Sequence, residues 1–146
     1  MPDVPDPRPT RHLAVVTCMD ARIDVFATLG LQLGQAHVIR NAGGRVTEDV
    51  LRSLALSVHV LGVHSVTVMQ HTGCGLVGVT DEELREITGS PIEFLPIDDH
   101  TAALEEDVKV LAGVPYLEPM RTVTGLVYDL GSGRVDEVVR WERNGA

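Results

Sequence analysis

The stretch SVTVMQHTGCG, residues 65–75, joins an apolar run to a glycine-rich turn that carries a histidine and a cysteine. Residues 65–70 have the length and the β-branched content of a buried strand, so they predict a strand that runs directly into His71. In open sheets of parallel strands, chemistry gathers at the carboxyl ends of the strands. The stretch therefore predicts a strand of a parallel sheet, with a functional site where that strand ends.

Further strands and helices are predicted on both sides of this stretch. In chain order, the other predicted elements are a strand over 12–17, a helix over 24–30, a strand over 36–40, a helix over 47–61, helices over 81–87 and 98–111, and strands over 122–128 and 134–140. The glycine-rich connection at 129–133 predicts an antiparallel hairpin. This order predicts an α/β fold: a mostly parallel central sheet with flanking helices on both faces and an antiparallel C-terminal edge strand.

Composition limits the organisation and the partners. The chain has 146 residues, which is the usual size of one domain, and its proline-rich start predicts an extended arm over 1–11 before a single domain over 12–146. A net charge of -9 disfavours nucleic acid and anionic membrane surfaces as partners. The first residues lack the basic and then apolar pattern of a secretion signal, so a cytoplasmic location is expected.

The chain has two cysteines, Cys18 and Cys74, and composition alone leaves three roles open: buried thiols, a disulfide or metal ligands. Their neighbours favour a metal. His71 and Cys74 are three residues apart on a tight turn, and Cys18 follows the predicted strand 12–17. Thiolate sulfur and imidazole nitrogen are zinc ligands, and three protein ligands leave one position for water or substrate. We therefore predict one catalytic zinc ion between Cys18, His71 and Cys74.

Asp20 and Arg22 follow Cys18 closely, in the string CMDAR. Asp20 can act as a conditional fourth metal ligand, which closes the site. Alternatively Arg22 holds this carboxylate through two parallel hydrogen bonds, which leaves the site open and lets Asp20 accept a hydrogen bond from a water on the zinc. A simpler interpretation is a surface ion pair that contributes about 0–1 kcal/mol.

Three strings in this order, CMDAR at 18–22, RNAGG at 40–44 and HTGCG at 71–75, resemble the β-class carbonic anhydrases. The resemblance is close over the first half of the chain, and the length is similar to that of compact members without a long N-terminal helical extension. It implies that Cys18, His71 and Cys74 bind one Zn²⁺ per chain. It also implies that Asp20 and Arg22 form the catalytic pair.

The same resemblance implies a reaction and an assembly. The expected activity is the reversible hydration of carbon dioxide to bicarbonate and a proton, by a zinc-bound hydroxide that the Asp-Arg pair orients. The RNAGG string is expected to line the pocket or a subunit interface, and the chain to form a homodimer or a multiple of dimers. An exposed histidine such as His37 or His100 is a candidate to pass the product proton to bulk water.

Other functions compete with this one. Residues 73–78 fit the G-x-G-x-x-G pattern of dinucleotide-binding turns, but no helix is predicted to begin there and prolines occupy the region of the expected second strand. A non-catalytic zinc-binding domain is a second alternative, although closed structural sites usually have four Cys or His ligands. The third keeps the fold and the metal and changes the substrate to carbon disulfide or carbonyl sulfide, which the ligand set does not distinguish from carbon dioxide.

Overall fold

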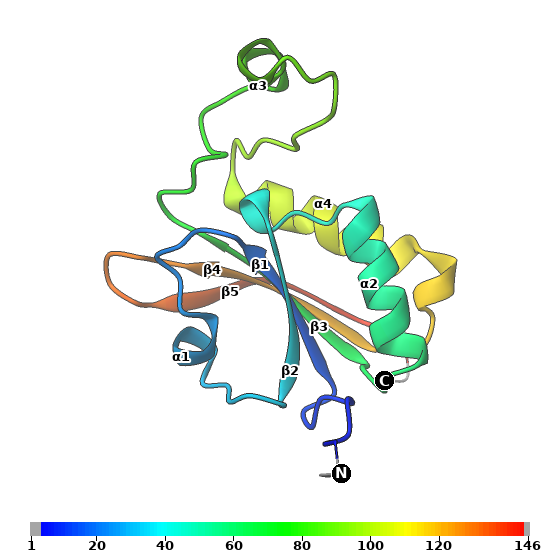
Figure 1. The fold of residues 1–146 in the computed structure, drawn as a ribbon. Helices are drawn as coiled ribbons and strands as arrows, with labels where there is room; N and C mark the ends of the chain where they lie inside the picture. Colours follow the sequence, from blue (N-terminus) through cyan, green and yellow to red (C-terminus); the bar gives the residue numbers. More distant parts are fainter. Residues whose placement is uncertain (1–3, 145–146) are drawn as a thin grey trace.

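A computed structural model describes residues 4–144 of the chain (Figure 1). The strands are β1 (Leu13–Cys18), β2 (Ala36–Asn41), β3 (Ser65–His71), β4 (Thr122–Tyr128) and β5 (Val135–Glu142), and the helices are α1 (Val25–Leu29), α2 (Glu48–His59), α3 (Asp81–Thr88) and α4 (His100–Gly113). Residues 1–3 of the predicted arm and 145–146 of the predicted domain lie outside the described residues. The division of the chain into an arm and one domain stays a prediction.

Within residues 4–144, the five strands form one sheet in the order β2-β1-β3-β4-β5. The first four strands run parallel, and β5 pairs antiparallel with β4. The predicted fold class is therefore confirmed: a mostly parallel sheet with an antiparallel C-terminal edge strand and flanking helices. β1 lies at the centre of the parallel part, between β2 and β3.

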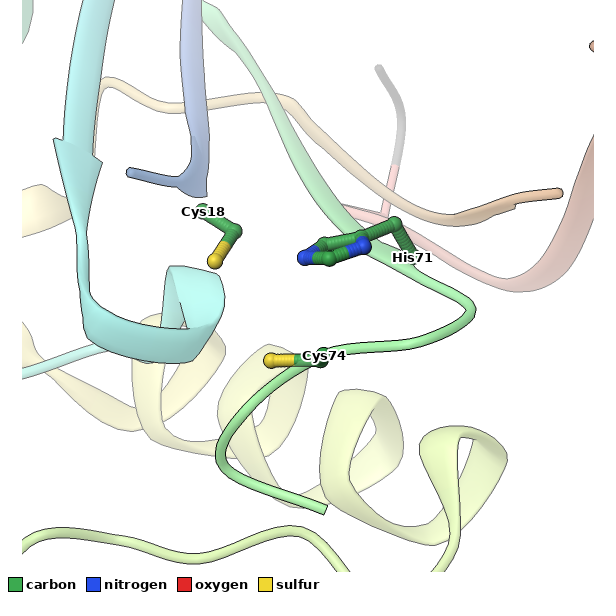
Figure 2. A group of neighbouring side chains, drawn as sticks. All are labelled: Cys18, His71 and Cys74. Carbon is green, nitrogen blue, oxygen red and sulfur yellow. The ribbon is translucent and has the colours of Figure 1, made fainter. Parts of the chain in front are cut away.

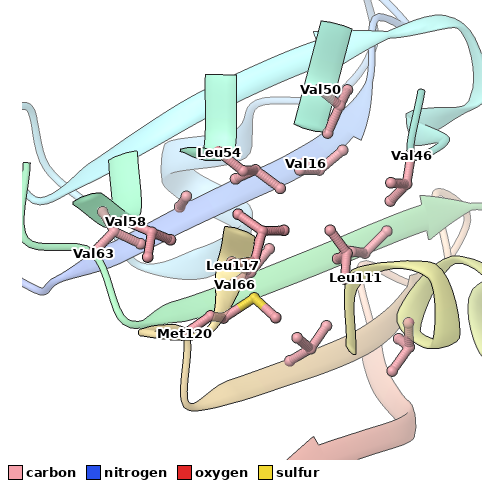
Figure 3. Close-up of a cluster of buried hydrophobic side chains, with 14 of the residues drawn as sticks. Val16, Val46, Val50, Leu54, Val58, Val63, Val66, Leu111, Leu117 and Met120 are labelled. Carbon is pink, nitrogen blue, oxygen red and sulfur yellow. The ribbon is translucent and has the colours of Figure 1, made fainter. Parts of the chain in front are cut away.

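Two hydrophobic clusters cover the two faces of the sheet. Side chains alternate along β1, so Ala14 and Val16 enter the larger cluster with α2 and α4, whereas Val15 enters the smaller cluster with Val25 of α1. Figure 3 shows the larger cluster, in which Leu54 of α2 packs over the strands. The smaller cluster also contains Cys18 and Cys74, so one of the two cores is continuous with the predicted site.

The ends of the helices follow local capping chemistry. Asp24 and Thr47 accept hydrogen bonds from the first turns of α1 and α2, as their positions in the sequence predict. Asp99 does the same for α4, so this helix begins at His100, two residues after the predicted residue 98. α2 ends at His59, before the predicted residue 61, because the amide groups of residues 60 and 61 both donate to the Leu56 carbonyl.

α3 belongs to an excursion of the chain, residues 76–97, that rises beyond the carboxyl ends of the strands (Figure 1). None of the α3 residues is buried. The excursion returns to the body at Ile97, whose amide donates to the Leu76 carbonyl and whose side chain is buried. No helix of the described residues is both long enough and apolar enough to cross a membrane.

A buried ion pair fixes the base of this excursion. Arg45, which follows the RNAGG string, donates to Asp107 of α4 through Nε at 2.8 Å and Nη2 at 3.1 Å. Both side chains are 3% exposed. Asp107 also accepts from the Val46 amide, and Arg45 Nη1 donates to the Leu95 carbonyl at 2.8 Å. One pair therefore joins α4, the segment before α2 and the end of the excursion.

Asp107→Ala is expected to lower the free energy of unfolding by about 3–5 kcal/mol, because it leaves the Arg45 charge buried without its partner. Denaturant unfolding followed by circular dichroism measures this loss. Glu106→Ala is the matched control, because Glu106 lies 3.7 Å from the same guanidinium but is 67% exposed. Its loss is expected to stay within about 0–1 kcal/mol. Equal losses in the two variants would contradict this account of the buried pair.

Candidate active site

Cys18, His71 and Cys74 converge at the carboxyl edge of the sheet (Figure 2). Cys18 ends β1, His71 ends β3, and Cys74 lies on the turn that follows (the HTGCG turn, residues 71–75). β1 and β3 are parallel neighbours, so their ends meet at one edge. The three possible ligand atoms lie within 4.8 Å of one another, and all three residues are buried. This group can hold a metal ion.

The His71 ring is prepared for such an ion. Its Nδ1 lies 2.7 Å from the Thr72 carbonyl oxygen, and since a carbonyl only accepts, Nδ1 carries the proton and Nε2 has a free lone pair. Nε2 is buried, and it has no hydrogen-bond partner among the described residues. A buried acceptor left without a partner costs about 1–3 kcal/mol. A cation between the three side chains would satisfy this nitrogen.

The two sulfur atoms also suit a cation. Both cysteines are free thiols, 5% and 7% exposed. Burial raises the pKa of the Cys74 thiol, although the Leu76 amide, which donates to this sulfur at 3.5 Å, acts in the opposite direction. A bound cation stabilises the thiolate form and removes this penalty. Two thiolates and one imidazole are a ligand set that zinc favours.

Arg22 holds Asp20 beside the cluster through a two-pronged ion pair. Arg22 Nη2 donates to Asp20 Oδ2 at 2.6 Å and Nε donates to Oδ1 at 2.9 Å, while the Arg22 amide donates to Oδ1 at 2.8 Å. These bonds hold the pKa of the Asp20 carboxyl well below its usual range. Asp20 Oδ2 lies 3.7 Å from His71 Nε2, so the ionised carboxylate faces the cluster while it stays on Arg22.

The same guanidinium joins the two segments that carry the site. Arg22 Nη2 also donates to the Gly73 carbonyl at 3.0 Å, on the HTGCG turn. The Arg22 side chain is 61% exposed, whereas the Asp20 side chain is 13% exposed. Because an exposed partner is well solvated, the pair contributes little to stability. It fixes the direction of the carboxylate.

An apolar pocket of about 410 Å³ opens beside the cluster. Besides Cys18, Asp20 and Cys74, its lining includes Met19, Ala42, Gly43, Leu76, Leu84 and Phe94. Leu84 and Phe94 belong to the excursion, so the excursion forms one wall of the pocket. The sequence analysis did not identify these two residues. The sequence gives little indication of their role, because they are two apolar residues in an otherwise acidic segment.

Comparisons with known proteins agree with this geometry. The family model described as carbonic anhydrase matches residues 13–105. Beta-carbonic anhydrase 1 of Mycobacterium tuberculosis is 38% identical over 137 residues, which cover 89% of this chain and 83% of that protein. The chain belongs to the β-carbonic anhydrase family. It is therefore a member of a family of enzymes, as the three sequence strings predicted.

A solved structure and a further relative show which named activities occur among proteins similar to this chain. The crystal structure of carbonic anhydrase from Streptococcus mutans superposes with a TM-score of 0.85 at 39% identity, covering 95% of this chain and 88% of that chain. A carbon disulfide hydrolase of Acidianus sp. (strain A1-3) is 45% identical over 74 residues, which cover 51% of this chain and 36% of that protein. The shared region thus occurs in proteins named for two different substrates.

The RNAGG string, residues 40–44, packs against the backbone of Cys18 and Met19. The Met19 amide donates to the Asn41 carbonyl at 2.7 Å, and Asn41 Oδ1 accepts from the Arg45 amide at 3.0 Å, which closes the turn. Gly44 adopts φ +64°, and a Cβ atom there would lie 2.9 Å from the Cys18 nitrogen and from the Met69 carbonyl oxygen. Glycine is therefore required for this turn to pack against the backbone of a ligand residue.

The two histidines considered as proton carriers lie in different places. On β2, Asn41 pairs with Cys18 at the edge of the sheet that carries the site, and His37 lies four residues before Asn41. His37 is therefore about 13 Å along the strand from that edge. His100 begins α4, and its Nδ1 lies 2.7 Å from Oε1 of Gln70, the residue before His71. Burial lowers the pKa of His100, and the nearby His71 adds to this effect. Of these two, His100 is closer to the cluster.

The glycine pattern at 73–78 does not open a helix. After Gly78, the chain continues through Val79 and the capping residue Thr80 before α3 begins at Asp81. A dinucleotide site needs a helix N-terminus directly at the glycines, where it meets the pyrophosphate. The geometry therefore disfavours the dinucleotide alternative.

Gly44→Ala is expected to destabilise the protein more than Gly30→Ala, which is the matched control. Gly30 has nearly the same φ, +65°, but a Cβ there meets nothing within 4 Å. Backbone strain alone costs about 1–2 kcal/mol, and the contacts at Gly44 add about 1–3 kcal/mol. Denaturant unfolding measures both losses, and a chelator competition is expected to show weaker zinc binding for Gly44→Ala only. Indistinguishable variants would contradict the role given to Gly44.

Proposed function

We propose that this chain binds one Zn²⁺ ion at Cys18, His71 and Cys74 and catalyses the reversible hydration of carbon dioxide to bicarbonate and a proton. One observation carries the proposal: a buried Cys-His-Cys cluster whose histidine Nε2 has no partner among the described residues, with an ionised carboxylate held 3.7 Å from that nitrogen. Membership of the β-carbonic anhydrase family and the carbonic anhydrases matched over most of the chain support it.

Bound zinc supplies a Lewis acid that makes a water molecule acidic enough to act as a nucleophile near neutral pH. The chain contributes three ligands and leaves a fourth position open as long as Arg22 holds Asp20. Asp20 is ionised and faces the cluster, so it accepts a hydrogen bond from the attacking water and orients it. The bond from Arg22 to the Gly73 carbonyl keeps Asp20 and the ligand turn in a fixed relation.

The pocket suits a small, uncharged substrate. Its walls are largely apolar, and carbon dioxide has no net charge and no hydrogen-bond donor. Bicarbonate is charged and is better solvated by water than by this wall, which favours its release. His100 is our candidate to receive the proton, because it adjoins Gln70 next to the cluster.

Carbon disulfide or carbonyl sulfide hydrolysis is the alternative reaction, and it needs the same cluster. Carbon dioxide is favoured because the carbonic anhydrases cited above are 38% and 39% identical over most of this chain, whereas carbon disulfide hydrolases that cover a similar share of it are 28% identical. We also propose a cytoplasmic location and assembly as a homodimer or a multiple of dimers. The non-catalytic alternative requires a closed site, and Arg22 restrains Asp20, whose carboxylate faces the cluster.

Metal analysis together with stopped-flow CO₂ hydration between pH 6.5 and 9 tests the function. About one zinc per chain is expected, with a hydration rate that rises with pH because the attacking water must lose a proton before it adds to CO₂. A zinc content near zero would exclude the metal site. Zinc without CO₂ hydration, but with release of sulfide from carbon disulfide, would instead establish the alternative substrate. A rate that is flat over this range would contradict the pH prediction.

Asp20→Ala and Arg22→Ala are expected to retain zinc and to lower kcat by about 10²–10⁴-fold. The first variant removes the carboxylate that orients the attacking water, and the second removes the guanidinium that holds this carboxylate in place. Asp136→Ala is the matched control. Asp136 forms an ion pair of the same sequence spacing with Arg134 at 2.8 Å, on the exposed C-terminal strand. Its kcat should equal that of the parent. Loss of zinc in both site variants would mark the pair as structural.

A further inference from the structure

Arg40, near the end of the edge strand β2, binds three carbonyl groups around the loop that connects β1 to α1 (the β1–α1 loop, residues 19–24). Its Nε donates to the Cys18 carbonyl at 2.9 Å, and its Nη2 donates to the Asp20 carbonyl at 2.6 Å. Its Nη1 lies 3.3 Å from the Ile23 carbonyl. The three oxygens come from one short stretch of backbone and converge on one guanidinium.

The chemistry of arginine explains why this residue occupies the position. The β1–α1 loop leaves the sheet, so its carbonyl groups need donors other than those of a neighbouring strand. Guanidinium offers five N–H groups in a rigid plane and stays charged at every relevant pH. Its hydrogen bonds are charge-assisted and therefore stronger than those between neutral groups. A single lysine ammonium cannot match three oxygens that are spread along a loop.

The loop has other restraints at its two ends. The Met19 amide donates to the Asn41 carbonyl at 2.7 Å, and the Ile23 amide donates to the Asp20 carbonyl at 3.2 Å. Ile23 is 3% exposed and anchors the far end of the loop in the smaller cluster, whereas Met19 is 64% exposed and does not anchor the start of the loop. The Asp20 carboxylate therefore depends on two arginines: Arg22 binds its oxygens, and Arg40 fixes the backbone from which it projects.

We infer that Arg40 is a positioning residue that holds the backbone of Cys18, Asp20 and Ile23 and so keeps the Asp20 carboxylate on Arg22 and away from the fourth position of the metal site. The inference rests on the proposed zinc site. Asp20 Oδ2 is already 3.7 Å from His71 Nε2, so a small rotation of a released loop is enough to bring the carboxylate onto the metal.

Arg40 can be replaced without unfolding the protein. The residue is exposed at the edge of the sheet, and its bonds are to neutral carbonyl groups, so its removal leaves no buried charge without a partner. Arg45 differs in this respect, because its partner is the buried carboxylate of Asp107. Variants at Arg40 therefore report on the site rather than on the whole fold.

The test compares Arg40→Gln and Arg40→Lys with the parent, each as the zinc protein and as the cobalt-substituted protein. The visible absorption of Co²⁺ reports directly whether a carboxylate has joined the sulfur and nitrogen ligands. Arg40→Gln is expected to bind about one metal per chain, to change the cobalt spectrum, and to lower kcat by about 10–100-fold, which is the effect of a displacement near 1 Å. Arg40→Lys is expected to lie between Arg40→Gln and the parent.

Two controls separate positioning from a general effect. Arg52→Gln removes an arginine that is 78% exposed and pairs with Asp49 on α2, and it should match the parent in spectrum and kcat. In an Asp20→Asn background, Arg40→Gln should cause no further spectral change, because the group that it releases is no longer a carboxylate. A spectral change of equal size in that background would overturn the inference.

The remaining outcomes distinguish this inference from the proposed function. A parent that binds cobalt but hydrates no CO₂ would refute the proposed reaction, while a changed spectrum in Arg40→Gln would still support the positioning role. An active parent whose Arg40→Gln variant keeps the parent spectrum and kcat would overturn the inference and leave the reaction in place. A parent that binds no metal would overturn both.

Discussion

Parallel pairing of β1 with β3 is the constraint on which the candidate site depends. Register brings Thr17 opposite Met69, so Cys18 and His71 leave the sheet at the same edge and within one residue of the same level. Antiparallel neighbours would have placed their ends at opposite edges. The HTGCG turn then adds Cys74 to the cluster, and the RNAGG turn packs Gly44 closely against the backbone of Cys18 and Met69. The cluster is thus a consequence of strand direction and of backbone packing.

Segments at this edge have little secondary structure of their own, and three arginines hold them. Arg40 binds the β1–α1 loop, Arg22 binds the HTGCG turn, and Arg45 binds the end of the excursion that carries one wall of the pocket. Each guanidinium donates to main-chain carbonyl groups of a connecting segment. Two of these cations, Arg22 and Arg40, also bind Asp20, through its carboxylate and its main-chain carbonyl respectively.

Sequence reasoning succeeded where the information is local. Apolar runs, capping residues such as Asp24 and Thr47, and the glycine-rich hairpin predicted the elements and their order, because each depends on a few neighbouring residues. The convergence of Cys18 with the HTGCG turn was predicted as well, because the ends of parallel strands meet. Whether these residues bind zinc stays a prediction that the metal analysis tests.

Contacts between distant segments could not be predicted in the same way. Asp107 is 62 residues from Arg45 in the chain. Helical spacing places Asp107 on the same face as Leu104 and Leu111, but it does not identify Arg45 as the partner. The three carbonyl partners of Arg40 are main-chain atoms, so they have no residue type that a motif could record. The choice between His37 and His100 likewise needed the strand register, which only the folded chain shows.

Access of the Asp20 carboxylate to the candidate metal site is expected to depend on backbone geometry more than on the Asp20–Arg22 ion pair. Arg22 is 61% exposed, so solvent screens its attraction for Asp20, and a bound cation would compete for the same carboxylate at short range. An ion pair with so exposed a partner would not by itself hold the carboxylate away from a cation bound at the cluster by any large margin. The restraint has to come from the main chain that carries Asp20, whose carbonyl Arg40 binds at 2.6 Å. Control of the open site is therefore expected to lie in the residues that hold the β1–α1 loop, where substitutions change no ligand and no catalytic side chain.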